Sequence, residues 1–167
     1  MSASPVSAPP RQAEVILDYR QLAHRLAAER SEGRTIALTN GCFDLLHVGH
    51  LRLLREGATL GDLLVVALNT DESVRAQKGA TRPWVPLEER AELIAGISGV
   101  RFVTSFGESD AAALLRCLEP HVHVKGTDWT VETVPERSVV LAYGGRIAIC
   151  GDPKTHSSTD LARRARA

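Results

Sequence analysis

Two histidines, His47 and His50, are the residues of this sequence best placed to do chemistry. They lie three residues apart in the stretch GCFDLLHVGH, residues 41–50, just before a segment with helical apolar spacing. Side chains at this spacing point the same way from the start of a helix, and imidazoles take up a proton when an anion favours it. Two converging imidazoles can stabilise charge that builds on a phosphate in a transition state. The pair therefore predicts phosphoryl or nucleotidyl transfer.

The sequence around the pair is typical of an anion-binding site. A helix N-terminus offers unpaired backbone N–H groups and a partial positive charge, which attract phosphate. Gly41 and Gly49 would let phosphate oxygens approach the backbone, because they carry no side chain. Two other interpretations stay open. One histidine could cap the helix while the other packs against the sheet, or both could bind a metal ion with His121 and His123.

The elements that must hold these residues alternate between apolar, β-branched runs and segments with helical spacing. This alternation predicts an α/β fold, a Rossmann-like doubly wound parallel sheet covered on both faces. In such sheets the ligand lies beyond the carboxyl ends of the strands, where the first strand leads into the histidine stretch. The predicted strands are residues 35–40, 62–69, 100–104, 121–126 and 146–150, and the predicted helices are residues 18–32, 48–60, a short one after 71, 86–97, 109–118 and a basic one from 157.

The composition limits the classes of protein to which the chain can belong. Its 167 residues suit one domain, and 20 basic residues balance 20 acidic ones, so no global field favours nucleic acid or an anionic membrane. Three cysteines without paired spacing, no signal peptide and no apolar run of membrane-spanning length indicate a cytoplasmic setting. Residues 1–12, rich in Ser, Ala and Pro, predict a disordered leader before a single domain at 13–167.

Five motifs, in this order, carry a resemblance to a known family. They are GCFDLLHVGH, NTDESV, QKGATRPWVPLEER, VKGTDW and HSSTDLARR, and they extend over nearly the whole chain from about Gly33. Together they resemble the HxGH nucleotidyltransferase superfamily in its cytidylyltransferase-like branch. Within it, KGATRPWVPLEER, VKGTDW and HSSTDL are most similar to the D-glycero-β-D-manno-heptose 1-phosphate adenylyltransferases.

This resemblance implies a reaction and its partners. ATP would transfer an adenylyl group to D-glycero-β-D-manno-heptose 1-phosphate, giving ADP-heptose and pyrophosphate for lipopolysaccharide core or another bacterial heptose glycan. Mg2+ is the implied cofactor and a homodimer the implied assembly. In many bacteria this domain is fused behind a sugar kinase, for which the chain is too short, so we expect a stand-alone form supplied by a separate kinase and phosphatase.

The resemblance also implies roles for residues of this sequence. His47, His50 and Lys78 are the expected catalytic groups, and Asp44 and Asp128 are the expected Mg2+ ligands. The residues expected to bind the nucleotide are Asn40, Gly41, Cys42, Phe43, Gly49, Arg90, Lys125, Gly126, Thr127, Ser157, Ser158 and Thr159.

Structural alternatives stand beside several of these roles. Asp44 would otherwise be a helix N-cap, and Lys78 a solvated lysine of a polar loop. Arg90 would otherwise be an exposed helix arginine paired with Glu88, a contact worth a few tenths of a kcal/mol. Trp129 is expected to pack rather than to stack on a base.

The last motif departs from the superfamily pattern. His156 stands where an isoleucine is usual, and Ala162 where an arginine is usual, with Arg163 one place later as the expected phosphate contact. The hydroxyl residues 157–159 would otherwise serve only as a helix N-cap.

Three rival functions remain. The nearest is a cytidylyltransferase that acts on glycerol 3-phosphate or a related alcohol phosphate, because side-chain identity does not encode the choice of base. The second is a module that senses a nucleotide without turnover, which would not need donors aimed at a transition state. The third is a metal-binding protein, which predicts stoichiometric zinc after purification.

Overall fold

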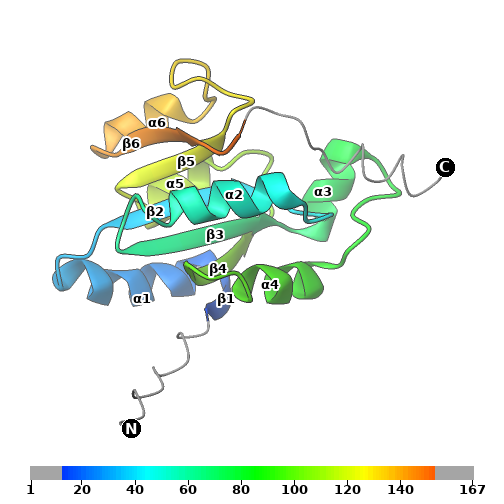
Figure 1. Cartoon of the computed structure of the whole chain (residues 1–167), viewed down its shortest axis with the longest axis horizontal. Helices are drawn as coiled ribbons and strands as arrows, with labels where there is room; N and C mark the ends of the chain where they lie inside the picture. Colours follow the sequence, from blue (N-terminus) through cyan, green and yellow to red (C-terminus); the bar gives the residue numbers. More distant parts are fainter. Residues whose placement is uncertain (1–12, 153–167) are drawn as a thin grey trace, which may run out of the picture.

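The computed structural model describes residues 13–152 of the chain. The predicted leader, residues 1–12, and the predicted last helix, from residue 157, lie outside the described residues. The described strands form one six-stranded sheet in the order β1-β4-β3-β2-β5-β6, and all neighbouring strands are parallel (Figure 1). The strands are β1 (Glu14–Asp18), β2 (Ile36–Gly41), β3 (Leu63–Asn69), β4 (Val100–Phe106), β5 (Val122–Gly126) and β6 (Arg146–Cys150), and the helices are α1 (Tyr19–Ser31), α2 (Val48–Gly57), α3 (Asp71–Lys78), α4 (Leu87–Ala95), α5 (Ala112–Leu118) and α6 (Arg137–Ala142).

Helices cover both faces of this sheet, which confirms the predicted doubly wound α/β fold. Along β3, Leu63 and Val65 belong to a core cluster shared with α1, α5 and α6. The alternate residues Leu64 and Val66 belong to a second cluster shared with α2 and α4. In Figure 1, α2 lies in front of the sheet and α5 behind it. Every residue of β3 is buried, as the continuous apolar run LLVVALN predicts for a strand with two covered faces.

The strand order changes direction beside β2. β3 and β4 follow one another on one side of β2, whereas β5 and β6 follow on the other side. In open parallel sheets, ligands bind at such a point, beyond the carboxyl ends of the two strands that border it. The GCFDLLHVGH stretch follows β2 and the KGTDW stretch ends β5, so the topology places both motifs at this crevice.

Two described elements, β1 and α6, are absent from the sequence-based expectation. β1 is a five-residue edge strand with acidic ends, and its apolar run, VIL, is only three residues long and not fully buried. α6 has six residues, of which only Val140 is buried, and no side-chain cap. α2 also ends at Gly57, three residues before the predicted end. The signals of such short, half-buried elements are weak, because their stability comes from packing.

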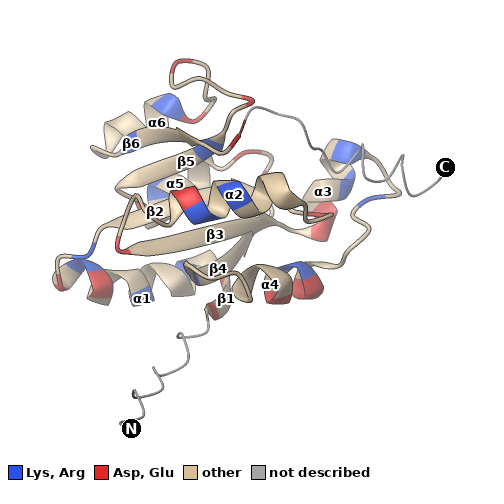
Figure 2. Ribbon diagram, viewed as in Figure 1, with Lys and Arg blue, Asp and Glu red and all other residues tan. Residues whose placement is uncertain are grey.

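The distribution of charge fits the balanced composition. Figure 2 shows acidic and basic residues interspersed along the described helices. α3 is ordered in charge: Asp71 and Glu72 lie in its first turn and Arg75 and Lys78 in its last, which suits the helix dipole. Within residues 13–152, no helix has both the length and the apolar character needed to cross a membrane.

Candidate active site

The histidine pair lies at the start of α2, where the chain leaves β2. His47 is the N-cap residue of α2, with extended backbone angles of φ −142° and ψ 170°, and makes no side-chain cap hydrogen bond. Its ring stacks on that of His50, with the ring centroids 3.8 Å apart and the planes inclined by 24°. The structure therefore brings the two predicted catalytic histidines together. The alternative in which one of them caps the helix is met in position by His47, without a capping hydrogen bond from its side chain.

The glycine between the histidines makes room for one of them. A Cβ atom built on Gly49 would lie 3.0 Å from both Cε1 and Nδ1 of His47. Any larger residue would push this ring away, because a Cβ atom and a neighbouring ring atom ordinarily lie farther apart than this. The space that was expected to admit a phosphate oxygen at Gly49 is thus occupied by the His47 ring. A Cβ on Gly41 would similarly lie 3.2 Å from Cε2 of Phe43; nucleotide binding by the two glycines stays a prediction.

Phe43 supports His50. The two ring centroids are 5.0 Å apart, at an interplanar angle of 50°. Phe43 is buried and has a φ of 46°, a left-handed conformation that bulky residues adopt only where the surroundings impose it. Nδ1 of His50 is buried without a hydrogen-bond partner among the described residues, so its ring is held by packing. Nε2 is therefore the His50 nitrogen left to reach a ligand.

The surroundings also keep His50 uncharged. Burial, the neighbouring His47 and the positive charge of Lys78 lower the pKa of His50 from 6.5 to about 4. Lys78 is the exposed last residue of α3 rather than a loop residue, and its positive charge has a smaller effect on the pKa of His50 than burial does. A catalytic role for Lys78 stays a prediction. A bound anion would oppose these effects and raise the His50 pKa.

Asp44, an expected Mg2+ ligand, anchors a loop instead. Its side chain is buried, and its carboxylate accepts hydrogen bonds from Nε of Arg82 at 2.6 Å and from the backbone N–H groups of Trp84 at 2.8 Å and Val85 at 3.0 Å. In this arrangement Asp44 does not fit the role of a metal ligand, and it is not the N-cap of α2 either. Asp128, the other expected ligand, is exposed. Residues 13–152 contain no cluster of three side chains suited to hold a metal ion.

Arg90 joins the segments that surround the site. It is buried, and its NH1 donates to the carbonyl oxygens of Cys42 at 2.6 Å and Asn69 at 2.9 Å. Its Nε donates to the carbonyl oxygen of Val85 at 2.9 Å, and its NH2 pairs with Asp71 at 2.6 Å. The alternative of an exposed helix arginine is therefore wrong. Contact between Arg90 and a nucleotide stays a prediction, and the observed contacts assign Arg90 to holding the loops.

The carboxyl end of β5 forms the other side of the crevice. Nζ of Lys125 lies 3.5 Å from the Glu136 carboxylate and 5.6 Å from the centre of the Trp129 ring. Trp129 is 37% exposed and so is only partly packed. The hydroxyl group of Thr127 donates to the carbonyl oxygen of Asp152 at 2.7 Å. These contacts hold the end of β5, including Gly126, and the segment that follows it. Nucleotide binding by Lys125, Gly126 and Thr127 stays a prediction.

Sequence reasoning missed one polar contact that spans the crevice. Nε2 of His123 lies 2.9 Å from Oδ1 of Asn40, across the β2–β5 pair. The strand alternation in HVHVK predicts which face His123 occupies, but not the strand opposite. The thiol of Cys42 also donates to Oδ1 of Asn69, at 3.6 Å.

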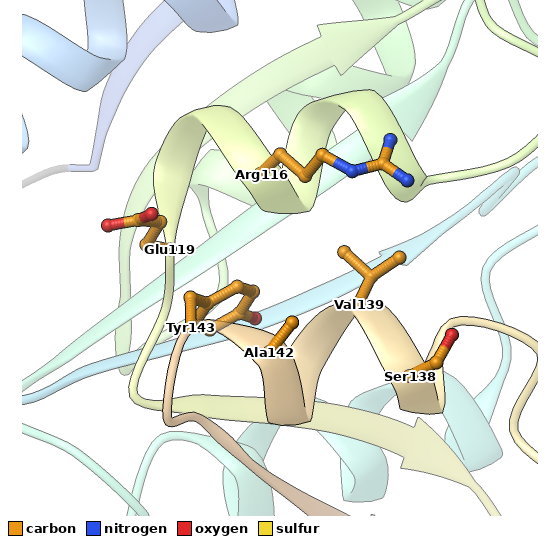
Figure 3. A pocket seen from close by; sticks show the side chains of 6 residues that line it. All are labelled: Arg116, Glu119, Ser138, Val139, Ala142 and Tyr143. Atoms are coloured by element: carbon orange, nitrogen blue, oxygen red, sulfur yellow. The ribbon is translucent and has the colours of Figure 1, made fainter.

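Other features lie apart from this site. The expected phosphate contacts Ser157, Ser158, Thr159 and Arg163 fall outside the described residues. A pocket of about 460 Å³ opens between α5 and α6, which cover the face opposite α2, so it is separate from the histidine pair (Figure 3). Its lining residues are Arg116, Glu119, Ser138, Val139, Ala142 and Tyr143.

Comparisons with known proteins identify the family of the chain. The family model described as cytidylyltransferase-like matches residues 38–164. Among curated proteins, the chain is 45% identical over 145 residues to the bifunctional protein HldE of Geotalea uraniireducens. That match covers 87% of this chain but 30% of the relative, so the chain spans less than a third of that protein.

Two solved structures share the fold. The lipopolysaccharide core biosynthesis protein from Thermoplasma volcanium superposes with a TM-score of 0.63 at 26% identity, over 73% of this chain and 100% of that one. Pantoate-beta-alanine ligase from Francisella tularensis superposes with a TM-score of 0.60 at 16% identity, over 92% of this chain and 77% of that one. The second likeness concerns the fold alone.

Proposed function

The chain belongs to the cytidylyltransferase-like family of nucleotidyltransferases, and from this premise we propose that it transfers an adenylyl group from ATP to D-glycero-β-D-manno-heptose 1-phosphate. The observation that carries the proposal is the stacked pair His47 and His50 at the start of α2, with the charge of Lys78 close by. This arrangement offers hydrogen-bond donors and positive charge at one end of the sheet, where ligands of such folds bind.

In the proposed reaction, an oxygen of the sugar phosphate attacks the α-phosphorus of ATP. The new P–O bond forms as the bond to the β-phosphate bridging oxygen breaks, so that pyrophosphate leaves with its electron pair. The attacking phosphate is ionised at neutral pH, and no general base is required. The protein therefore accelerates the reaction by positioning the two phosphates and by stabilising the charge of the transition state.

His50 suits this role as a neutral hydrogen-bond donor at the start of α2. His50 is neutral without ligand, with a pKa of about 4, and its Nε2–H donates to a phosphate oxygen. Negative charge that accumulates in the transition state raises the pKa of His50 and strengthens the hydrogen bonds that the imidazoles donate. Lys78 contributes a mobile positive charge from the end of α3.

Mg2+ is part of the proposal as an ion that arrives with the nucleotide. Mg2+ is commonly held by one or two carboxylates together with substrate phosphates, and it neutralises phosphate charge. Asp44 is engaged by Arg82 and the backbone of the following loop, so it supplies no ligand in the observed arrangement. No step of the reaction above depends on a metal ligand from the described residues.

Two lines of support favour the heptose phosphate as the acceptor. The motifs KGATRPWVPLEER, VKGTDW and HSSTDL are similar to those of the heptose 1-phosphate adenylyltransferases. The relative from Geotalea uraniireducens is named bifunctional protein HldE, and the structure from Thermoplasma volcanium is titled a lipopolysaccharide core biosynthesis protein. Since the chain spans only part of the first of these relatives, the acceptor, the glycan and the homodimer are proposals.

The decisive experiment is an assay of pyrophosphate release that crosses ATP and CTP with D-glycero-β-D-manno-heptose 1-phosphate and glycerol 3-phosphate. The proposal expects turnover with ATP and the heptose phosphate. Turnover with CTP and glycerol 3-phosphate instead would support the rival cytidylyltransferase and refute the proposed substrates.

Substitution of both histidines distinguishes an enzyme from a nucleotide sensor. We expect the double variant H47A/H50A to lose turnover by orders of magnitude and still to bind ATP, since its other contacts remain. A sensor would show no pyrophosphate release in the natural protein with any substrate pair.

A further inference from the structure

A buried histidine next to the proposed nucleotide site has no role in the reaction described above. His123 is the second residue of β5 and is 0% exposed. Its Cα pairs with that of Leu38 on β2, and Asn40 lies two residues further along β2, on the same face of the sheet. The ring reaches along that face, and its Nε2 lies 2.9 Å from Oδ1 of Asn40.

The surroundings define the protonation of this ring. Burial, with a smaller effect from the charge of Lys125, lowers the pKa of His123 from 6.5 to about 3, so the ring is neutral at physiological pH. Its Nδ1 is buried without a hydrogen-bond partner among the described residues. A buried bare nitrogen is less costly than a buried N–H group without an acceptor. The proton therefore resides on Nε2, and this nitrogen donates to Asn40 Oδ1.

This hydrogen bond decides which way the Asn40 amide faces. An amide that accepts through Oδ1 on one side carries its two N–H donors on the other. Asn40 is only half-buried, and the described residues give its Nδ2 group no hydrogen-bond partner. Asn40 is also the next-to-last residue of β2, at the crevice where the strand order changes direction.

We propose that His123 is a positioning residue that fixes the Asn40 amide, so that the Asn40 Nδ2 group presents its N–H donors to a nucleotide bound between the ends of β2 and β5. The inference rests on the proposed function, because it assumes a nucleotide in this crevice. Without the His123 donor, the amide rotates freely or turns its oxygen toward the phosphates and sugar, which are themselves rich in acceptors.

The test is a double-mutant cycle on nucleotide binding, measured by calorimetric titration of the full chain with ATP and Mg2+ in the absence of sugar phosphate. We expect H123L to weaken ATP binding by about tenfold, on the order of one lost hydrogen bond. In the N40A background the same H123L change should alter ATP affinity by less than about twofold, because its target is gone. H123Q, whose amide can donate to Asn40 Oδ1, should restore most of the affinity.

A matched control comes from the residue that precedes β5. His121 is exposed and accepts a hydrogen bond from the Ile36 backbone N–H at 2.9 Å, and Asn can accept in its place, so H121N should leave ATP affinity unchanged. An equal loss from H123L in both backgrounds, or no loss in either, would overturn the inference.

The same titration separates this inference from the proposed function. ATP binding without turnover would contradict the function and leave the cycle measurable. Failure to bind either ATP or CTP would overturn both.

Discussion

The contact between Gly49 and the His47 ring predicts an unusual variant, one that is folded and stable but catalytically impaired. In G49A the new Cβ would lie 3.0 Å from Cε1 and Nδ1 of His47, whereas carbon atoms in contact are ordinarily about 3.5 Å apart or more. The ring must therefore move by roughly half an ångström or rotate away. Because misplacement by about 1 Å can cost about a hundredfold in rate, we expect kcat to fall by roughly ten- to a hundredfold.

The same variant should be as stable as the natural protein or slightly more stable. Gly49 is the second residue of α2, and alanine is favoured over glycine within a helix by about 0.5–1 kcal/mol. His47 is only half-buried, so its ring can yield without disturbing the core. Thermal unfolding, followed by circular dichroism, should give a Tm equal to or slightly above that of the natural protein.

G96A is the matched control. Gly96 is the exposed residue after α4, in a right-handed helical conformation, and its added Cβ would meet only backbone oxygen at 3.4 Å or more. We expect natural kcat for G96A. Natural kcat in G49A would refute the claim that Gly49 is there to seat the ring, and a large drop in the Tm of G49A would refute the claim that the ring yields.

Three further predictions concern the charged groups around the site. R90M should lower the free energy of unfolding by about 3 kcal/mol or more in chemical denaturation, because it leaves three buried or partly buried carbonyl oxygens without their donor; natural stability would contradict this. D44N should destabilise the protein by a similar amount with EDTA present, because it breaks the buried pair with Arg82, whereas a purely metal-binding Asp44 predicts no effect without metal. The unfolded chain protonates His50 near pH 6.5 and the folded chain only near 4, so stability is fully present above 6.5 and falls as the pH drops toward 4. H50N should flatten this fall in the free energy of unfolding, whereas other groups with a lowered pKa, His123 and Glu108 among them, still contribute a slope.

Signals confined to a short stretch of sequence predicted much of the fold. Parallel strands such as β3 are continuous apolar runs because both of their faces are buried, and α1 begins after the capping residue Asp18 and ends two residues before Gly33, whose φ is 78°. β1 escaped prediction because its identity as a strand depends on pairing with β4, almost ninety residues away.

In the candidate site, too, some features follow from local sequence and others depend on distant partners. The spacing of His47 and His50 predicts that they lie together, whereas the stacking of their rings also depends on the extended backbone of His47, which the spacing does not show. The position of Arg90 depends on carbonyl oxygens 21 and 48 residues away in the chain, and that of His123 on Asn40, 83 residues away. Such partners are set by the packing of the sheet, and no local pattern encodes them.

These distant contacts change how loss of activity at the site should be interpreted. Asp44 and Arg90 are both buried ionic residues whose observed partners belong to the protein itself, yet the loops that they hold lead directly to the histidine pair. Both residues contact Val85, Asp44 through its backbone N–H and Arg90 through its carbonyl oxygen, so the two anchors act on one loop. Substitution of either should therefore reduce activity and stability together. G49A should reduce activity without loss of stability, because it displaces the His47 ring. The comparison therefore distinguishes residues that hold the loops of the site from histidines that act on the phosphates.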